Sequence, residues 1–198
     1  MRGKLIVIEG IDGAGKTTIA KYVVDLMISK GIKAIYTREP YDSQIIKLLE
    51  SKGKELGAVM EALLLAADRY LHIHEVIRPH LEAGYYVICD RYHYSSLAYQ
   101  GARGADVNWI KTINFFVIKP DISIYLDVSP EVGLSRLSKD LKRRLRYLED
   151  IELLQKVRSN YLKLVKSKEL LYVNAERPLD EVKINVVNII KNKLGVEL

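Results

Sequence analysis

The sequence predicts an α/β fold in which a five-stranded parallel sheet lies between two layers of helices. The first observation is that the 198 residues contain five short apolar runs of strand length. The second is that the segments between these runs carry apolar residues at helical spacing, an alternation typical of parallel sheets with helices on both faces. The third is that no tract rich in Pro, Gly or Ser divides the chain. We therefore expect one domain over residues 1–198 with a buried core of ordinary size.

Each expected element has its own local signal. The apolar runs that predict strands cover residues 5–9, 34–37, 85–89, 122–128 and 170–173. Apolar side chains recur at helical spacing from residue 19 to residue 27 and predict a helix over 17–30, which Gly31 ends. Further helical patterns cover residues 59–81, 106–117, 151–165 and 179–190.

Composition and charge narrow the class of protein. Cys89 is the only cysteine, which excludes an intramolecular disulfide and makes a reducing cytoplasm the expected location. The apolar runs are far shorter than a bilayer crossing, so no transmembrane helix is expected. The four histidines show no zinc-site spacing, and we expect them to be satisfied or solvated. The net charge of +6 favours anionic partners, which include nucleic acids, membranes and phosphorylated small molecules.

A phosphate-binding loop follows the first predicted strand. Residues 10–17 read Gly-Ile-Asp-Gly-Ala-Gly-Lys-Thr and fit the pattern G-x-x-x-x-G-K-[ST]. Small residues let backbone N–H groups converge on phosphate oxygens, and the next helix adds its positive end. Lys16 would reach the β- and γ-phosphates of ATP, and the Thr17 hydroxyl would ligate Mg²⁺. The expected fold is therefore that of a P-loop NTPase, with ATP bound by Gly10, Ile11, Asp12, Gly13, Ala14, Gly15, Lys16, Thr17 and Thr18.

The loop alone does not identify the reaction, because GTPases, motors, transporters and kinases all use it. A GTPase would carry an Asn-Lys-x-Asp guanine reader, whereas residues 192–195 read Asn-Lys-Leu-Gly. A small chain with cations and aromatic residues near the predicted strand ends favours a kinase that encloses two nucleotides. Two alternatives remain open: another nucleoside or nucleotide kinase, and an ATP-dependent switch whose basic surface contacts nucleic acid.

Further segments resemble the thymidylate kinase family of archaea and bacteria. They are Ile-Glu-Gly-Ile-Asp-Gly at 8–13, Thr-Arg-Glu-Pro at 37–40, Leu-Leu-Leu-Ala-Ala-Asp-Arg at 63–69, and the stretch from Asp-Arg-Tyr at 90–92 to Tyr-Gln-Gly at 99–101. The matches continue in order to about Val128. The resemblance implies ATP- and Mg²⁺-dependent phosphorylation of dTMP to dTDP in nucleotide biosynthesis. It also implies a homodimer whose partners are small molecules rather than nucleic acid or membrane.

The resemblance also assigns catalytic and metal-binding roles. Arg91 would bridge the acceptor phosphate and the transferring group, for which a bidentate guanidinium is suited. Asp12 and Lys16 are the other expected catalytic residues near the loop. Asp90 would orient Arg91 or hold Mg²⁺ through water, so Thr17 and Asp90 form the expected metal site.

The acceptor nucleotide is expected to lie against residues of the later motifs. The implied set is Glu9, Arg38, Pro40, Leu65, Arg69, Arg91, Ser95, Ser96, Tyr99 and Gln100. Arg69 would donate to a pyrimidine carbonyl, while Ser95, Ser96 and Gln100 would read the base edge and Tyr99 would pack under the deoxyribose. Leu65 stands where the family usually has a stacking phenylalanine, which forfeits about 0.5–1.5 kcal/mol. We therefore hypothesise a looser pocket that accepts dUMP beside dTMP.

A basic segment after the fourth predicted strand has two interpretations. Its cations are Lys139, Lys142, Arg143, Arg144 and Arg146. Such a run is commonly a solvated helix face, but here it resembles the lid that closes over ATP in this family, at about residues 138–150. Some family members carry an arginine in the phosphate loop where this chain has neutral Ala14. The lid would then supply the missing cation, which makes Arg143, Arg144 and Arg146 catalytic candidates.

Overall fold

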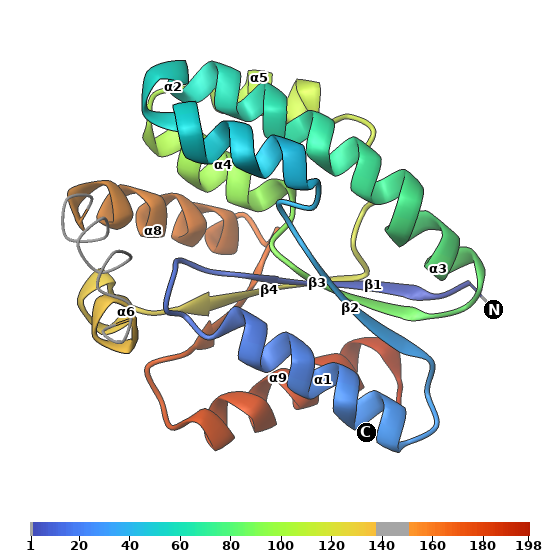
Figure 1. Ribbon diagram of the computed structural model, residues 1–198. Coiled ribbons are helices and arrows are strands. Elements are labelled where there is room, and N and C mark those ends of the chain that lie inside the picture. Colours follow the sequence, from blue (N-terminus) through green and yellow to red (C-terminus); the bar gives the residue numbers. More distant parts are fainter. Residues whose placement is uncertain (1, 138–150) are drawn as a thin grey trace.

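The computed structural model describes residues 2–137 and 151–198. Its centre is a sheet of five strands in the order β2-β3-β1-β4-β5, in which every neighbouring pair is parallel (Figure 1). The strands are β1 (Lys4–Glu9), β2 (Ala34–Arg38), β3 (Tyr86–Asp90), β4 (Ile122–Asp127) and β5 (Leu171–Asn174). Each expected strand is present, with bounds shifted by one residue at most ends. The expected five-stranded parallel sheet is confirmed.

Helices cover both faces of this sheet. On one face lie α1 (Lys16–Ser29) and α9 (Leu179–Leu194), and the other face carries α2 (Ser43–His72), α4 (His93–Ala102), α5 (Val107–Ile113) and α8 (Ile151–Lys166). A π-helical turn, η1 (Ile73–Ile77), and α3 (Arg78–Glu82) continue α2, while α6 (Pro130–Arg136) follows β4. These three layers complete the expected α/β fold (Figure 1).

The central strand explains why the chain needs both layers. β1 pairs with β3 along one edge and with β4 along the other, and helices cover both faces of the sheet at this point. Its residues Leu5, Ile6, Val7 and Ile8 are fully buried, which is why this strand reads as a continuous apolar run rather than an alternating one. The chain leaves β1 toward β2 and β3 and later crosses to β4 and β5. Such a reversal opens a crevice at the carboxyl ends of the strands, where ligands bind in open α/β sheets.

The long helical segment differs from the expected 59–81. It begins at Ser43, because the Asp42 carboxylate caps it by accepting hydrogen bonds from the N–H groups of Gln44 and Ile45. A kink at Gly57, with φ of 69° and ψ of 166°, interrupts it. Near its end the ring of Pro79 conflicts with the carbonyl four residues earlier, and the chain widens into the π-helical turn just before it.

Three shorter differences also have local causes. The helix expected over 106–117 ends at Ile113. α4 was not expected because its motif reads as a loop, and α6 was not expected although Ser129 caps it and Pro130 occupies its first turn. Of the helices in the described part of the chain, none combines the length and apolar character required to span a bilayer.

Candidate active site

The phosphate loop connects β1 to α1 and closely approaches α6. Gly13 and Gly15 have φ angles of +83° and +89°, in the left-handed region that favours glycine. A Cβ on Gly13 would lie 2.2 Å from the carbonyl oxygen of Gly133 in α6, so no larger residue fits there without movement. The N-terminus of α1 therefore opens onto a cleft between the loop and α6, with backbone N–H groups that its own helix does not satisfy.

A cavity of about 520 Å³ lies over this loop, a volume within the usual range for small-molecule sites. The loop residues from Asp12 to Thr18 line it, and its other walls are Ile19, Arg136, Leu137, Ala175, Arg177, Leu179 and Val182. Of the expected ATP-binding residues, Gly10 and Ile11 are buried and do not line the cavity. We refer to this space as the donor cavity.

Lys16 is held at the floor of the donor cavity. Its Nζ donates a 2.9 Å hydrogen bond to the carbonyl oxygen of Ile11 and lies 3.9 Å from Oδ1 of Asp12. Burial lowers the pKa of Lys16 to about 8, and the positive charge of Arg91 acts in the same direction. An anionic phosphate beside the ammonium would oppose both effects and favour the charged form.

Thr17 and Asp90 meet where the loop faces the end of β3. The Thr17 hydroxyl donates a 2.5 Å hydrogen bond to Oδ2 of Asp90, and the Tyr36 hydroxyl lies 3.4 Å from the same oxygen. The other carboxylate oxygen, Oδ1, is buried, and among residues 2–137 and 151–198 it has no hydrogen-bond partner. A hydroxyl beside a carboxylate with an unpaired oxygen is the hard-oxygen donor set that Mg²⁺ prefers. The residues present therefore fit the expected metal.

A second cavity, of about 200 Å³, lies between α2, α4 and the segment after β2. Its lining residues are Glu39, Pro40, Leu65, Arg69, Arg91, Tyr92, Ser95, Ser96, Tyr99 and Gln100. All the expected acceptor-binding residues are among them except Glu9 and Arg38. Glu39 and Tyr92 were not in the expected set, although both stand inside the motifs that suggested it. We refer to this space as the acceptor cavity.

A third cavity, of about 310 Å³, adjoins the other two. It shares Asp12, Lys16 and Thr17 with the donor cavity, and Glu39, Pro40 and Arg91 with the acceptor cavity. Arg38, Ile46, Leu49, Glu50 and Asp90 complete its lining. Cations and the candidate metal ligands thus gather in the space that adjoins both the donor and the acceptor cavity, which we call the connecting cavity.

Arg91 stands at the junction of the acceptor and connecting cavities. Its backbone has φ of 72°, a left-handed conformation that costs a non-glycine residue roughly 1–2 kcal/mol. Its Nη2 donates to Oδ1 of Asp12 at 2.5 Å and its Nη1 donates to the Ser95 hydroxyl at 3.2 Å. The guanidinium also lies over the Tyr99 ring, 5.1 Å from its centroid. The side chain is thereby held between the loop and α4.

Glu9 supports this arrangement from below the cavity wall. Its fully buried carboxylate accepts hydrogen bonds from the N–H of Tyr92 at 2.8 Å, from the Ser95 hydroxyl at 2.7 Å and from the Tyr161 hydroxyl at 2.8 Å. Burial raises the pKa of Glu9 above its ordinary value. Because its oxygens are occupied by protein donors, Glu9 positions the start of α4 instead of lining the acceptor cavity.

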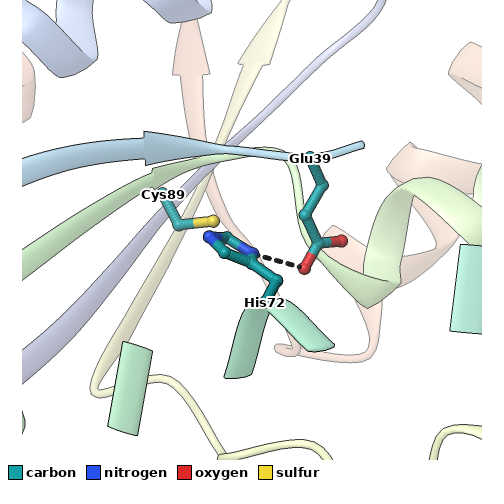
Figure 2. Close-up of side chains that lie close together, drawn as sticks. All are labelled: Glu39, His72 and Cys89. Atoms are coloured by element: carbon teal, nitrogen blue, oxygen red, sulfur yellow. Dashed lines mark hydrogen bonds and ion pairs between the residues drawn. The ribbon is translucent and has the colours of Figure 1, made fainter. Parts of the chain in front are cut away.

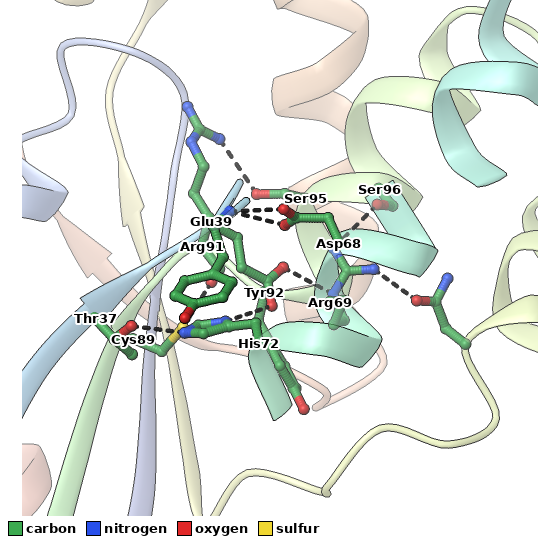
Figure 3. A network of polar contacts seen from close by, with 12 residues as sticks. Thr37, Glu39, Asp68, Arg69, His72, Cys89, Arg91, Tyr92, Ser95 and Ser96 are labelled. Atoms are coloured by element: carbon green, nitrogen blue, oxygen red, sulfur yellow. Dashed lines mark hydrogen bonds and ion pairs between the residues drawn. The ribbon is translucent and has the colours of Figure 1, made fainter. Parts of the chain in front are cut away.

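Arg69 is fixed by three protein acceptors. Its side chain is 2% exposed, and it donates from Nε to Glu39 at 2.8 Å, from Nη1 to Asn114 at 2.6 Å and from Nη2 to Ser96 at 3.3 Å (Figure 3). An arginine has five N–H donors, so two have no hydrogen-bond partner among the described residues, and Arg69 lines the acceptor cavity.

A buried chain of hydrogen bonds continues from Arg69 to the sheet. The Glu39 carboxylate that receives Arg69 also lies 3.2 Å from Nδ1 of His72, and the opposite ring nitrogen, Nε2, lies 2.6 Å from the Thr37 hydroxyl (Figures 2 and 3). Cys89 lies close by, and its thiol donates to the carbonyl oxygen of Arg91 at 3.0 Å.

Glu39, His72 and Cys89 place potential metal-binding atoms within 4.8 Å of one another. Both ring nitrogens of His72 are already hydrogen-bonded, however, and burial raises the pKa of Cys89, which favours the thiol over the thiolate that a metal needs. The cluster is therefore a hydrogen-bonded support for Arg69. His72 and Asn114 carried no signal in the sequence, because their partners Glu39 and Arg69 are distant in the chain and meet them only through packing.

The basic segment carries the remaining expected catalytic residues. Arg143, Arg144 and Arg146, with the expected lid at 138–150, lie outside the described residues. Ala14, the neutral loop residue that motivated the expectation, is buried on the donor-cavity wall.

Comparison with known proteins agrees with this geometry. A family model described as thymidylate kinase matches residues 8–186. The probable thymidylate kinase of Staphylothermus marinus is 45% identical over 193 residues, which cover 97% of this chain and 96% of that protein. The probable thymidylate kinase of Pyrococcus horikoshii is 43% identical over 204 residues, covering 98% of both chains. The matched region includes both cavities, and the expected class of enzyme, a kinase, is confirmed. The chain belongs to the thymidylate kinase family.

Proposed function

We propose that the protein transfers the γ-phosphoryl group of ATP to dTMP and releases dTDP and ADP. The observation that carries this proposal is the connecting cavity, which joins a phosphate-loop cavity to a smaller pocket and is lined by Lys16, Thr17, Asp90 and Arg91. Phosphoryl transfer requires two anions to be brought together while charge spreads over the moving oxygens. A cation-lined passage between the donor cavity and the acceptor cavity meets that requirement.

The chain's own groups divide the work of transfer. Lys16 binds the β- and γ-phosphates from the loop side, and Arg91 reaches the acceptor phosphate from the β3 side, held in place by Asp12. Thr17 and Asp90 hold Mg²⁺, which neutralises charge on the ATP phosphates when bound. Arg38 faces the connecting cavity and is placed to meet the acceptor phosphate. Arg143, Arg144 or Arg146 supplies a further cation, which the neutral Ala14 does not provide.

The acceptor cavity suits a pyrimidine deoxynucleotide. Arg69 offers its two remaining N–H groups to a base carbonyl, and Ser95, Ser96 and Gln100 line the same wall. The Tyr99 ring packs against the Arg91 guanidinium at the side of the pocket, which is a place for the sugar. Leu65 lines the pocket without a ring to stack on the base. We therefore include dUMP as a second acceptor, and a preference for dTMP over dUMP above about 10³-fold would contradict that part.

A homodimer is the proposed assembly. The described helices leave several large apolar side chains of α2 exposed at helical spacing: Val59, Met60, Leu63, Tyr70 and Leu71. Exposed apolar side chains that gather on one helix are typical of protein–protein contacts. Light scattering on the purified protein should give twice the chain mass, and Leu63→Glu should reduce it, whereas Ile184→Glu on exposed α9 should not. The single domain and the cytoplasmic location stay predictions.

One coupled assay tests the reaction. ADP production is followed with ATP, Mg²⁺ and each nucleoside monophosphate in turn. Turnover that depends on dTMP, with a lower rate for dUMP and little for purine nucleotides, is the expected result. A purine nucleotide as best acceptor would assign the protein to another nucleotide kinase activity. ATP binding without any acceptor-dependent turnover would favour the switch alternative.

A further inference from the structure

A partly buried ion pair, between Glu61 and Arg103, adjoins Gln100 of the acceptor cavity. Glu61 in α2 accepts a hydrogen bond from Nε2 of Gln100 in α4 at 3.3 Å. Arg103, just past the end of α4, donates from Nη1 to both carboxylate oxygens of Glu61, at 2.5 Å to Oε2. Glu61 is only 7% exposed and does not line the cavity, whereas Gln100 lines it and is 6% exposed.

This contact fixes which end of the Gln100 amide faces Glu61. A carboxylate accepts hydrogen bonds and cannot donate them, so only the NH₂ end of the amide can face Glu61. Arg103, which can only donate, contacts both oxygens of Glu61, so the carboxylate acts as an acceptor toward both of its partners. The amide oxygen Oε1 is then turned away from Glu61, and within the described ranges it is buried without a hydrogen-bond partner. A buried acceptor without a partner is unfavourable, and on a residue that lines a cavity a donor of the ligand can satisfy it.

We infer that Glu61 is a specificity-determining positioning residue that makes Gln100 a hydrogen-bond acceptor toward the base. This inference rests on the proposed role of the acceptor cavity. Thymine and uracil present a ring N–H beside a carbonyl oxygen, whereas cytosine presents a bare ring nitrogen beside an amino group. Arg69 provides the donor for the carbonyl and Gln100 the acceptor for the N–H. The wall therefore complements a thymine or uracil edge and opposes cytosine at both positions.

The same contact also joins two helices, and this role must be separated from base selection. Glu61 and Arg103 connect α2 to α4, so their loss can lower stability without any effect on specificity. A purely structural role would change the kinetics of all acceptors alike. An orienting role changes the ratio between acceptors, because reversing one amide converts a favourable contact for one base into a favourable contact for the other.

The test is Glu61→Gln, which keeps the size of the side chain. Arg103 can only donate, so the Gln carbonyl at position 61 turns toward Arg103 and its NH₂ faces Gln100. The Gln100 amide then reverses and offers N–H to the cavity. We expect the dTMP-to-dCMP ratio of kcat/KM to fall by at least about tenfold, with dCMP turnover rising in absolute terms and the KM for ATP unchanged. Arg103→Lys, which keeps a positively charged donor beside Glu61, should leave the ratio as it is.

A second variant guards against loss of folding. Glu61→Lys combined with Arg103→Glu restores an ion pair with reversed charges and places a donor opposite Gln100, so it should shift the ratio in the same direction. Gln100→Ala reports on the cavity itself and should raise the KM for dTMP. Suppose that Gln100→Ala raises the KM for dTMP, while folded Glu61 variants leave the dTMP-to-dCMP ratio unchanged or slow both acceptors equally. The inference about Glu61 is then wrong, and the proposed role of the acceptor cavity is retained. If Gln100→Ala leaves the KM for dTMP unchanged, both the proposed role of Gln100 in base binding and the inference about Glu61 are wrong.

Discussion

At the scale of single residues, the site works through side chains that are held rather than free. Arg91 combines a left-handed backbone with hydrogen bonds to Asp12 and Ser95, and such strain persists only where the surroundings over-determine it. A cation held in advance of the reaction does not need to reorganise when charge develops on the transferring group.

Arg91→Ala should therefore affect the chemical step more than ATP binding. Because Arg91 faces the acceptor and connecting cavities and not the donor cavity, the Kd for ATP should change little. We expect kcat to fall by about 10²–10³-fold, the loss typical of removing one transition-state donor. Arg91→Lys keeps the charge without the bidentate geometry and should recover part of the rate. An unchanged kcat in Arg91→Ala would show that another group bridges the phosphates.

Lys16 predicts a pH signature for ATP binding. Its pKa is lowered to about 8 in the nucleotide-free protein, so it is charged below that pH and increasingly neutral above it. Bound phosphates favour the charged form and raise the pKa again, which requires proton uptake when ATP binds near pH 8. Calorimetry in buffers of different ionisation enthalpy should detect this uptake. The uptake should disappear in Lys16→Met, and identical heats corrected for buffer in both proteins would contradict the assignment.

Substitution of His72, which does not line the acceptor cavity, should still change the binding of dTMP. Asparagine places an amide nitrogen near Nδ1 and keeps the contact with Glu39, whereas glutamine reaches the Nε2 position and keeps the contact with Thr37. Since Glu39 holds Arg69, His72→Asn should retain the KM for dTMP and His72→Gln should raise it about tenfold, the cost of an unpaired buried group. The KM for ATP should stay constant in both. Equal effects of the two variants would show that His72 acts through packing alone.

At the scale of elements, the phosphate loop depends on its contact with α6. Gly13→Ala would place a Cβ 2.2 Å from the Gly133 carbonyl oxygen, whereas a Cβ on Gly15 would meet nothing within 4 Å. Both positions have positive φ, so both variants carry a similar backbone strain of roughly 1–2 kcal/mol. The difference between them isolates the collision with α6. Gly13→Ala should therefore lower Tm and weaken ATP binding more than Gly15→Ala, and equal losses would show that the contact has little effect.

The helices and strands were largely predictable from local sequence patterns, whereas the contacts between distant side chains were not. The apolar runs predicted each strand because a parallel strand buried on both faces contains few polar residues. The start of α2 at Ser43 was missed because Gly53, Gly57 and a polar stretch weaken the helical period, and the π-helical turn needed the three-dimensional consequence of Pro79. The motif residues predicted most of the acceptor-cavity lining, whereas the loop residues predicted only half of the donor-cavity lining. Glu61, His72 and Asn114 were missed because packing of distant segments brings them to the site.

At the scale of the whole molecule, the three cavities form one path from donor to acceptor through shared lining residues. A compound that joins adenosine to thymidine through a chain of phosphates can then occupy all three at once. Once one nucleoside of the compound is bound, the other is already held near its cavity. Its binding therefore costs little further translational entropy. We expect such a compound to bind at least about 10²-fold more tightly than ATP or dTMP alone and to raise Tm further at equal concentration. Arg91→Ala, at the junction of two cavities, should remove most of this gain while leaving ATP affinity nearly intact. An affinity for the joined compound no greater than that for ATP would show that the two nucleotide sites are not connected as the cavities suggest.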